Sequence, residues 1–309
     1  MTEKNKQTMV SVCMVSYNHV NYIARSIESV LIQKTTFPIQ LVIGEDCSND
    51  GTADIVKYYA NKYPDTIKAR CNFQNMGMSS NFIKTLKECS GKYIAVLDGD
   101  DYWTDPFKLQ KQVDFLESNP RYSLCCHRYS IYNTYDSSYS KDYCADLFTD
   151  DIPGINIDLD LYFKCWITKA LTVVFRANCF DATIALRYKY FRDVHLFLHV
   201  LQNGKGYCFN FDGGVYIKHA DSVHSTISLM ERNKVAYLIF KELYEINKLK
   251  ILKDEYTKHL SVYIDLCFSE KKNYINIFAL WNEPFLHKMI AKKIINKLSK
   301  IVATCCTVF

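Results

Sequence analysis

The sequence predicts an α/β fold in which a doubly wound, mostly parallel, mixed sheet is flanked by helices. Between Val10 and about Tyr132, runs rich in apolar and β-branched residues alternate with stretches of helical periodicity. These runs lack the one-residue alternation of a half-exposed strand, which indicates a sheet covered on both faces. Strands that alternate with helices in this way form right-handed βαβ units.

The individual elements follow from these patterns. Strands are expected at 10–17, 39–46, 67–72, 92–98 and 122–132. The helices between them are marked by apolar stripes: Ile23, Ile27, Val30 and Leu31; Phe82, Ile83 and Leu86; Leu109, Val113 and Leu116. The segment 133–160 is rich in Tyr, Ser and Asp without a clear period, so it is expected to be an inserted loop.

The second half of the chain is expected to complete the domain. A strand is predicted at 167–176, a helix from Arg192 that ends at Gly204, and a strand pair at 205–211 and 213–220. From about 229 to 302 the pattern is helical. We therefore predict one α/β domain at 1–228, with halves at about 9–132 and 160–228, and a C-terminal helical extension at 229–309.

The composition limits the classes of protein to consider. Of 309 residues, 49% are hydrophobic and 23% charged, which is typical of a globular chain. The net charge of +5 is unevenly spread, because 288–300 holds five lysines and no acid, so nucleic-acid binding is not expected. The 13 cysteines are odd in number and form no CxxC pair, which favours a reducing cytoplasm over a disulfide framework or a zinc site.

Membrane association is expected to be peripheral at most. The N-terminus lacks the apolar core of a signal peptide, and no run of about 18 apolar residues predicts a spanning helix. In the basic C-terminal stretch one face carries Ile290, Ile294, Leu298 and Ile301. This helix either packs on the protein or touches the inner face of a membrane, and both interpretations stay open.

Polar residues follow four of the predicted strands. Ligands of open parallel sheets bind beyond the carboxyl ends of the strands, so these residues are expected at one rim. They are Ser16, Tyr17 and Asn18 after the first strand, Glu45 and Asp46 at the second, Asn72 and Asn75 near the third, and Asp98, Asp100 and Asp101 at the fourth. A helix cap explains Asp50 but not Glu45 or Asp46, whose carboxylates can bind a nucleobase N–H or a ribose hydroxyl.

The acidic cluster predicts a metal site. Like charges as close as Asp98, Asp100 and Asp101 resist joint ionisation, and a divalent cation relieves their repulsion. Mg²⁺ and Mn²⁺ prefer oxygen ligands and often combine one or two carboxylates with substrate phosphates. Gly99 is expected to let the backbone approach a ligand closely. The role of Asp101 is left open.

These segments, taken in order, carry a family resemblance. VSVCMVSYN (10–18), EDCSNDGT (45–52), NMG (75–77) and SGKYIAVLDGDDYWTDPFKLQKQ (90–112) resemble the family 2 glycosyltransferases of the GT-A fold. That family uses nucleotide sugars and transfers the sugar with inversion. The resemblance covers about 10–130 and extends more loosely to 228, which implies a nucleotide-binding half at 9–132 and an acceptor-side half at 160–228.

The resemblance also implies roles for single residues. Val15, Tyr17, Asp46, Asn75 and Asp98 would bind the nucleotide, with Asp98 near the ribose. Asp100 and His219 would hold Mn²⁺ or Mg²⁺ on the diphosphate.

An inverting transfer needs a base for the acceptor hydroxyl. Asp193 lies at the start of the helix that begins near 192, off its apolar stripe, where a helix cap and a base are equally compatible with the residues alone. The resemblance favours the base. His195 and His199 are one helical turn apart, and we interpret them as packing or surface residues rather than zinc ligands.

The implied reaction moves a sugar from a UDP-sugar to a hydroxyl of a saccharide or lipid-linked acceptor, in polysaccharide or glycoconjugate synthesis. A hexosyl- or N-acetylhexosaminyltransferase is the expected class. The alternative is a catalytically inactive nucleotide-sugar-binding partner of another transferase. A phosphotransferase of the haloacid-dehalogenase type ranks last, because that family places its Asp-x-Asp after the first strand and not the fourth.

Overall fold

The computed structural model describes residues 8–220 and 228–269, together with Leu280 and Glu283. The chain divides into two compact units, 1–225 and 226–309, where the sequence-based prediction placed the boundary after 228. The basic helix predicted around 290–301 lies outside the described residues. Among the helices that are described, none is long and apolar enough to cross a membrane.

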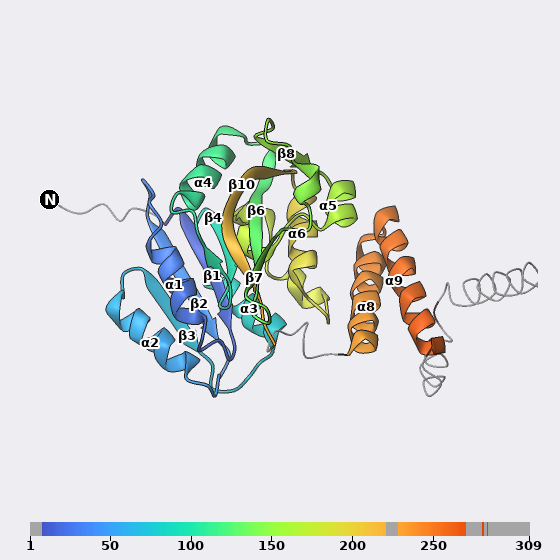
Figure 1. The fold of residues 1–309 in the computed structure, drawn as a ribbon, viewed down its shortest axis with the longest axis horizontal. Helices are drawn as coiled ribbons and strands as arrows, with labels where there is room; N and C mark the ends of the chain where they lie inside the picture. The colour runs from blue at the N-terminus through green and yellow to red at the C-terminus, as the bar shows by residue number, and fades with distance from the viewer. Residues whose placement is uncertain (1–7, 221–227, 270–279, 281–282, 284–309) are drawn as a thin grey trace, which may run out of the picture. The chain divides into compact units, whose positions relative to one another are not determined.

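The first unit is built around one mixed sheet (Figure 1). Its strands are β1 (Val10–Ser16), β2 (Ile39–Glu45), β3 (Ile67–Cys71), β4 (Tyr93–Asp98), β5 (Tyr102–Trp103), β6 (Tyr122–Asn133), β7 (Ser138–Lys141), β8 (Gly154–Ile157), β9 (Val174–Arg176) and β10 (Lys205–Lys218). Their order is β3-β2-β1-β4-β9-β6-β10-β5, with β7 paired to β6 and β8 paired to β10.

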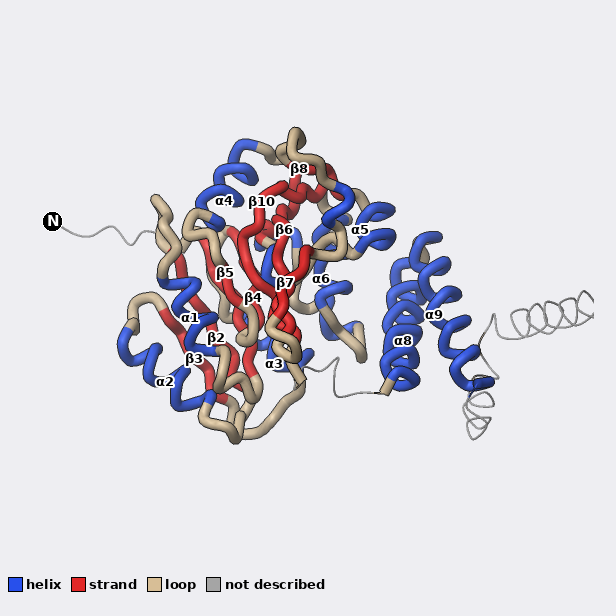
Figure 2. The backbone as a smooth tube through the Cα atoms, in the orientation of Figure 1, coloured by secondary structure: helices blue, strands red, loops and turns tan. Residues whose placement is uncertain are grey.

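Helices cover this sheet (Figure 2). The α-helices of the unit are α1 (Ile23–Leu31), α2 (Thr52–Lys62), α3 (Met78–Lys87), α4 (Lys108–Ser118), α5 (Leu159–Cys165) and α6 (Asp193–Leu201). Four short 3₁₀ turns are also described: Ala145–Leu147, Ala170–Thr172, Ala177–Cys179 and Ile184–Arg187.

The first four predicted strands form the parallel half of the sheet. β3, β2, β1 and β4 pair in parallel, and Val15 is in register with both Gly44 and Asp98. The carboxyl ends of β1, β2 and β4 therefore meet at one rim, as the strand pattern predicted. Alternate residues Val10, Val12 and Met14 of β1 join the core formed with α1, α2 and α4, so the intervening positions face the side covered by α3.

The fifth predicted strand, which is β6, was expected to continue the parallel sheet next to β4, but it does not pair with β4. β9 is inserted between β4 and β6 and runs antiparallel to both. The strand predicted at 167–176 is shortened to Val174–Arg176, because Ala170–Thr172 forms a 3₁₀ turn. A strand of three residues between two others is too short to show a periodicity by which its partners can be predicted.

Two other expectations were wrong. The strand pair predicted at 205–211 and 213–220 is one strand, β10, whose pairing with β6 shifts register on either side of Asp212. Gly213 and Gly214 thus belong to an irregular stretch of the strand and not to a turn. The segment 133–160 is not a plain loop, since β7 and β8 extend the sheet from within it.

The second unit contains a helix pair, as the sequence predicted for this region. α8 (Leu229–Asn247) and α9 (Lys250–Ser269) are joined by a tight turn in which Lys248 has a φ of 57°. Aromatic rings pack between the helices, with centroids 5.2 Å apart for Tyr237 and Tyr263. This packing gives the two helices an apolar core of their own.

One buried cation in the first unit stands out. Lys108, the first residue of α4, is 0% exposed, and its Nζ lies 3.9 Å from the ring centroid of Trp103. Among the described residues Nζ has no hydrogen-bond partner. Burial lowers the pKa of Lys108 to about 7. Its charged form is therefore costly in the folded protein.

Replacing Lys108 should stabilise the protein. We expect Lys108→Met to raise the melting temperature at pH 7 by at least about 2 °C, because a buried unsatisfied donor is removed. The unaltered chain should gain stability from pH 7 to 9, since its folded state has released the Lys108 proton while the unfolded state keeps it up to about pH 10.4. Scanning calorimetry at both pH values measures this, with the exposed Lys57→Met as control. A melting temperature below that of the unaltered chain would contradict the prediction.

Candidate functional site

The loop that follows β2 is held by Glu45, the last residue of that strand. Glu45 is 1% exposed, and its carboxylate accepts the backbone N–H groups of Cys47 (3.2 Å) and Ser48 (2.8 Å). Ser48 Oγ in turn accepts the N–H of Asn18, at 2.9 Å. The structure therefore gives Glu45, which was expected to face a ligand, the task of joining the rim loops after β1 and β2.

Asp46 organises the third loop of the rim. It is 2% exposed, and its carboxylate accepts N–H groups from Met76 (2.9 Å), Gly77 (2.9 Å) and the Asn72 side chain (2.8 Å). Gly77 has a φ of 80°, a conformation that favours glycine. These bonds draw the loop 72–77 over the end of β2.

Three other residues that were predicted to bind the nucleotide lie on the same rim. Val15 is partly buried in β1, Tyr17 is 43% exposed just beyond it, and Asn75 is exposed in the loop that Asp46 holds. The backbone N–H of Asp46 donates to the carbonyl of Ser16, at 3.0 Å, which ties the two strand ends together. The rim thus carries the buried carboxylate of Asp46 and the exposed ring of Tyr17.

The acidic loop after β4 is pinned to β1 and α1. The N–H of Gly99 donates to the carbonyl of Val15 (2.9 Å), and Ser26 Oγ lies 2.6 Å from the carbonyl of Asp101. A Cβ on Gly99 would lie 2.9 Å from Ser16 Oγ. Packing at the junction of β1 and α1 thus accounts for glycine at position 99. This packing explains the glycine without the expected approach of the backbone to a ligand.

Asp101 joins the acidic loop to β10. It is 2% exposed, and its Oδ1 accepts the backbone N–H of Ile217 at 2.9 Å. Burial and the nearby carboxylates of Asp100 and Asp98 raise its pKa well above the usual range. The role that the sequence left open for Asp101 is therefore to connect two strands.

Asp100 lies between two imidazoles. Its Oδ2 is 3.1 Å from His219 Nε2 and 3.7 Å from His19 Nε2, and the ring of Tyr22 packs 4.6 Å from that of His219. Burial alone would raise the pKa of Asp100, but His19 and His219 outweigh it and lower that pKa. His19 was not predicted as a site residue, although its position three residues after β1 was a signal that could have found it.

The surroundings of Asp100 suit a small divalent cation in part. Two ligands on adjacent corners of an octahedral Mg²⁺ site, each about 2.1 Å from the ion, lie about 3 Å apart, close to the separation of Asp100 and His219. Within the described part of the chain, however, no group of three or more His, Cys, Asp or Glu side chains forms a metal site. The protein would thus supply a partial ligand set that substrate phosphates and water complete.

Asp193 begins α6, but the helix is capped by other residues. The N-terminal cap position is Arg192, whose backbone N–H donates to His195 Nδ1 at 3.0 Å. The carboxylate of Asp193 accepts the N–H of the adjacent Val194, at 2.9 Å. Asp193 is therefore not the N-cap residue of α6, so helix capping does not explain an aspartate at this position.

The charge of Asp193 reaches the acidic loop. Burial and the charges of Asp100 and Asp193 together raise the pKa of Asp98 to about 7, while Lys169 opposes them. Asp98 and Asp193, which are far apart in the sequence, thus face the same region. The acidic loop therefore contacts His219 and lies within electrostatic reach of the start of α6.

His195 and His199 are packing residues, as expected. Both are buried, and His199 lies 2.8 Å from the hydroxyl of Tyr188. Burial lowers the pKa of His195 to about 3, so its imidazole is neutral.

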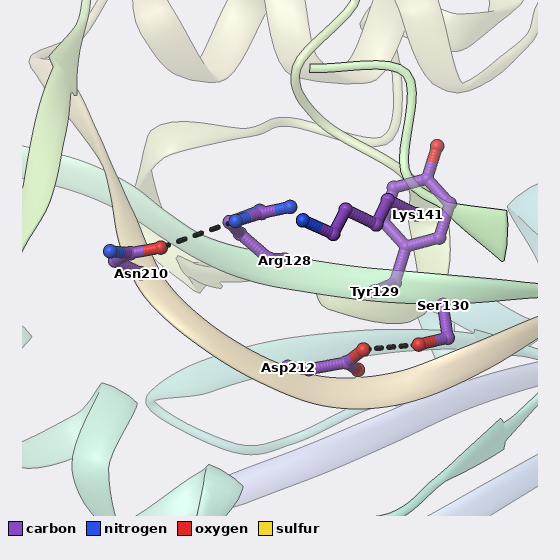
Figure 3. Close-up of a pocket in the computed structure, with 6 residues that line it drawn as sticks. All are labelled: Arg128, Tyr129, Ser130, Lys141, Asn210 and Asp212. Carbon is purple, nitrogen blue, oxygen red and sulfur yellow. Dashed lines mark hydrogen bonds between the residues drawn. The ribbon is translucent and has the colours of Figure 1, made fainter. Parts of the chain in front are cut away.

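Two hollows are described in the first unit. One, of about 310 Å³, is bordered by residues of β6, β7 and β10: Arg128, Tyr129, Ser130, Lys141, Asn210 and Asp212. Figure 3 shows a hydrogen bond from Arg128 to Asn210 and another from Ser130 to Asp212. None of the predicted site residues borders it. The second, of about 270 Å³, lies between residues 76–80 and Lys189, Tyr190 and Arg192, so it adjoins both the loop held by Asp46 and the start of α6.

Comparison with known proteins agrees with this geometry. The model of glycosyl transferase family 2 matches residues 11–143. The uncharacterized protein Rv1520 of Mycobacterium tuberculosis is 38% identical over 118 residues, 38% of this chain and 34% of that protein. The chain thus spans about a third of the length of the first relatives it matches. The relative UDP-Glc:alpha-D-GlcNAc-diphosphoundecaprenol beta-1,3-glucosyltransferase WfaP of Escherichia coli is 30% identical over 219 residues, 70% of this chain and 79% of that protein.

Solved structures share the fold. S. aureus TarS 1–349 in complex with UDP-GlcNAc aligns with a TM-score of 0.61 at 18% identity, over 91% of this chain and 78% of that one. The mannosyltransferase PcManGT from Pyrobaculum calidifontis, in complex with GDP-Man and Mn²⁺, aligns with a TM-score of 0.52 at 12% identity, over 98% of this chain and 84% of that one. With the match to WfaP over most of both chains, these findings show that the chain belongs to glycosyl transferase family 2.

Proposed function

We propose that this protein is an inverting glycosyltransferase that moves a sugar from a UDP-sugar to a hydroxyl of a saccharide or lipid-linked acceptor. The observation that carries the proposal is the acidic loop after β4, in which Asp100 lies 3.1 Å from His219 and Asp98 is within electrostatic reach of Asp193. The relative WfaP, whose name joins a UDP-sugar with a diphosphoundecaprenol-linked acceptor, supports this choice of substrates. A lipid-linked acceptor would place the reaction at the inner face of a membrane.

The donor would bind along the rim of β1, β2 and β4. Val15, Tyr17 and Asn75 would line the nucleoside, and Asp98 would bind the ribose. Asp46 would shape the base site mainly through the loop it holds, since its carboxylate already accepts three N–H groups. One carboxylate oxygen can accept a further bond, so contact with a nucleobase N–H is compatible with these bonds.

Asp100 and His219 would hold Mn²⁺ or Mg²⁺ at the diphosphate. When bound, such an ion offsets the negative charge that develops on the departing diphosphate. The complex of PcManGT with GDP-Man and Mn²⁺ supports the choice of a divalent ion. Asp100, whose pKa is lowered, is ionised at neutral pH and so is ready to act as a ligand.

Asp193 would act as the base. Its carboxylate takes the proton of the acceptor hydroxyl while that oxygen bonds to the anomeric carbon. The bond between the anomeric carbon and the phosphate oxygen breaks, and its electron pair leaves with the nucleoside diphosphate. Attack opposite the leaving group inverts the anomeric centre.

A thermal-shift screen of nucleoside diphosphates and nucleotide sugars with Mn²⁺ or Mg²⁺ tests the proposal. A ligand that binds the folded state raises its melting temperature. The absence of any shift across the panel would reject nucleotide-sugar binding. Binding without transfer or hydrolysis over a broad acceptor panel would favour the inactive partner instead, which the presence of both Asp100 and Asp193 argues against.

The base assignment predicts a selective loss. Asp193→Asn should leave the Kd for UDP within about twofold, because the amide keeps the shape of the side chain, and should lower kcat by at least about 100-fold. Calorimetric titration and a radiolabelled-sugar transfer assay measure the two quantities, with the exposed Asp160→Asn as the matched control. Full transfer activity in Asp193→Asn would reject the assignment.

The metal assignment predicts a loss that depends on the ion. Asp100→Ala should weaken UDP binding in the presence of Mn²⁺ by about 10- to 100-fold, the range seen when a metal site loses support. In EDTA the variant and the unaltered chain should bind UDP equally well. Asp65→Ala, at an exposed carboxylate, serves as control. An equal loss with and without Mn²⁺ would mean that Asp100 contributes through folding and not through the ion.

A further inference from the structure

Lys169 lies on a rigid turn close to the acidic loop. Its carbonyl accepts the backbone N–H and the hydroxyl of Thr172, at 2.8 and 2.7 Å. Two further carbonyls of the turn are also fixed, since Leu171 accepts the indole N–H of Trp103 (2.7 Å) and Thr172 accepts the side-chain amide of Gln112 (2.9 Å). The backbone that carries Lys169 therefore has little freedom to move.

The ammonium group of Lys169 is held by an aromatic ring. Its Nζ lies 4.1 Å from the ring centroid of Tyr216 on β10, a cation–π contact. Within the described ranges, Nζ makes no hydrogen bond and has no carboxylate within ion-pair distance. Three N–H donors on a partly buried cation are thus available to a ligand.

The charge of Lys169 acts on the site. It lowers the pKa of both Asp98 and Asp101, opposing the effect of burial and of the neighbouring carboxylates. Asp98 also feels Asp193, so Lys169 and Asp193 act on the same carboxylate from different parts of the chain. In the proposed reaction the sugar lies between the base and the departing phosphate. Tyr216, whose ring holds the ammonium, precedes Ile217, the residue whose backbone N–H donates to Asp101. A cation beside the acidic loop would suit that phosphate.

We propose that Lys169 binds the phosphate of the donor that departs from the sugar, and stabilises the charge that this phosphate gains in the transfer. This assignment rests on the proposed function. When the bond from the anomeric carbon breaks, its electron pair stays on the phosphate oxygen, and an ammonium already in place offsets that charge without reorganisation. Lysine is a common phosphate ligand, acting as a point charge.

The preference for UDP over UMP tests the role, because only UDP carries this phosphate. Calorimetric titrations in Mn²⁺ compare the unaltered chain with Lys169→Met, Lys169→Arg and the exposed control Lys164→Met. We expect Lys169→Met to weaken UDP binding at least 10-fold and UMP binding less than twofold. Lys169→Arg should recover most of the UDP affinity. In transfer assays Lys169→Met should lower kcat, with the KM of the acceptor unchanged.

Several results would overturn the assignment. An unchanged Kd for UDP in Lys169→Met would reject the contact, and equal losses for UDP and UMP would show that Lys169 only shapes the site. If Lys169→Met does not fold, as judged by circular dichroism, Lys169→Gln answers the same question. Failure of the unaltered chain to bind any nucleoside diphosphate would reject the proposed function along with this role, whereas normal binding by both chains rejects the role alone.

Discussion

The burial of the acidic loop after β4 is the constraint on which the rest of the site depends. Three carboxylates within four residues cannot all be buried and ionised unless each has a different environment. Asp101 accepts the N–H of Ile217, and Asp100 lies between His19 and His219. Asp98 is left with a pKa of about 7. The loop therefore holds less negative charge at neutral pH than its composition indicates.

These environments also determine how the unit is connected. Ile217 lies at the end of β10 and His219 directly follows that strand, while His19 lies between β1 and α1. The acidic loop thus joins segments from both halves of the α/β domain, and its burial requires both to be folded. A site assembled in this way forms only when long-range contacts are complete, so it cannot exist in the first half alone.

The parallel half of the fold and its polar rim could be predicted from the sequence, because strand and helix periods are local patterns. The position of β9 could not, since a three-residue strand is too short to show a period and its two partners are set by tertiary packing. Among the site residues, Asp98 and Asp100 follow directly from the strand pattern. The neighbourhood of Asp193 was inferred from family resemblance, and Lys169 had no signal beyond its charge.

Negative charge at the site has to be balanced when a donor binds. Asp100 and Asp193 leave the site acidic, and a nucleoside diphosphate would add further negative charge, so binding has to be paired with positive charge. The imidazole of His19 supplies little of it at neutral pH, because burial lowers the pKa of His19. Lys169, by contrast, stays near the carboxylates without contacting them. Because an aromatic ring holds this cation, it can pair with an incoming anion. An ion pair between Lys169 and Asp98 would have occupied the cation before the anion arrived.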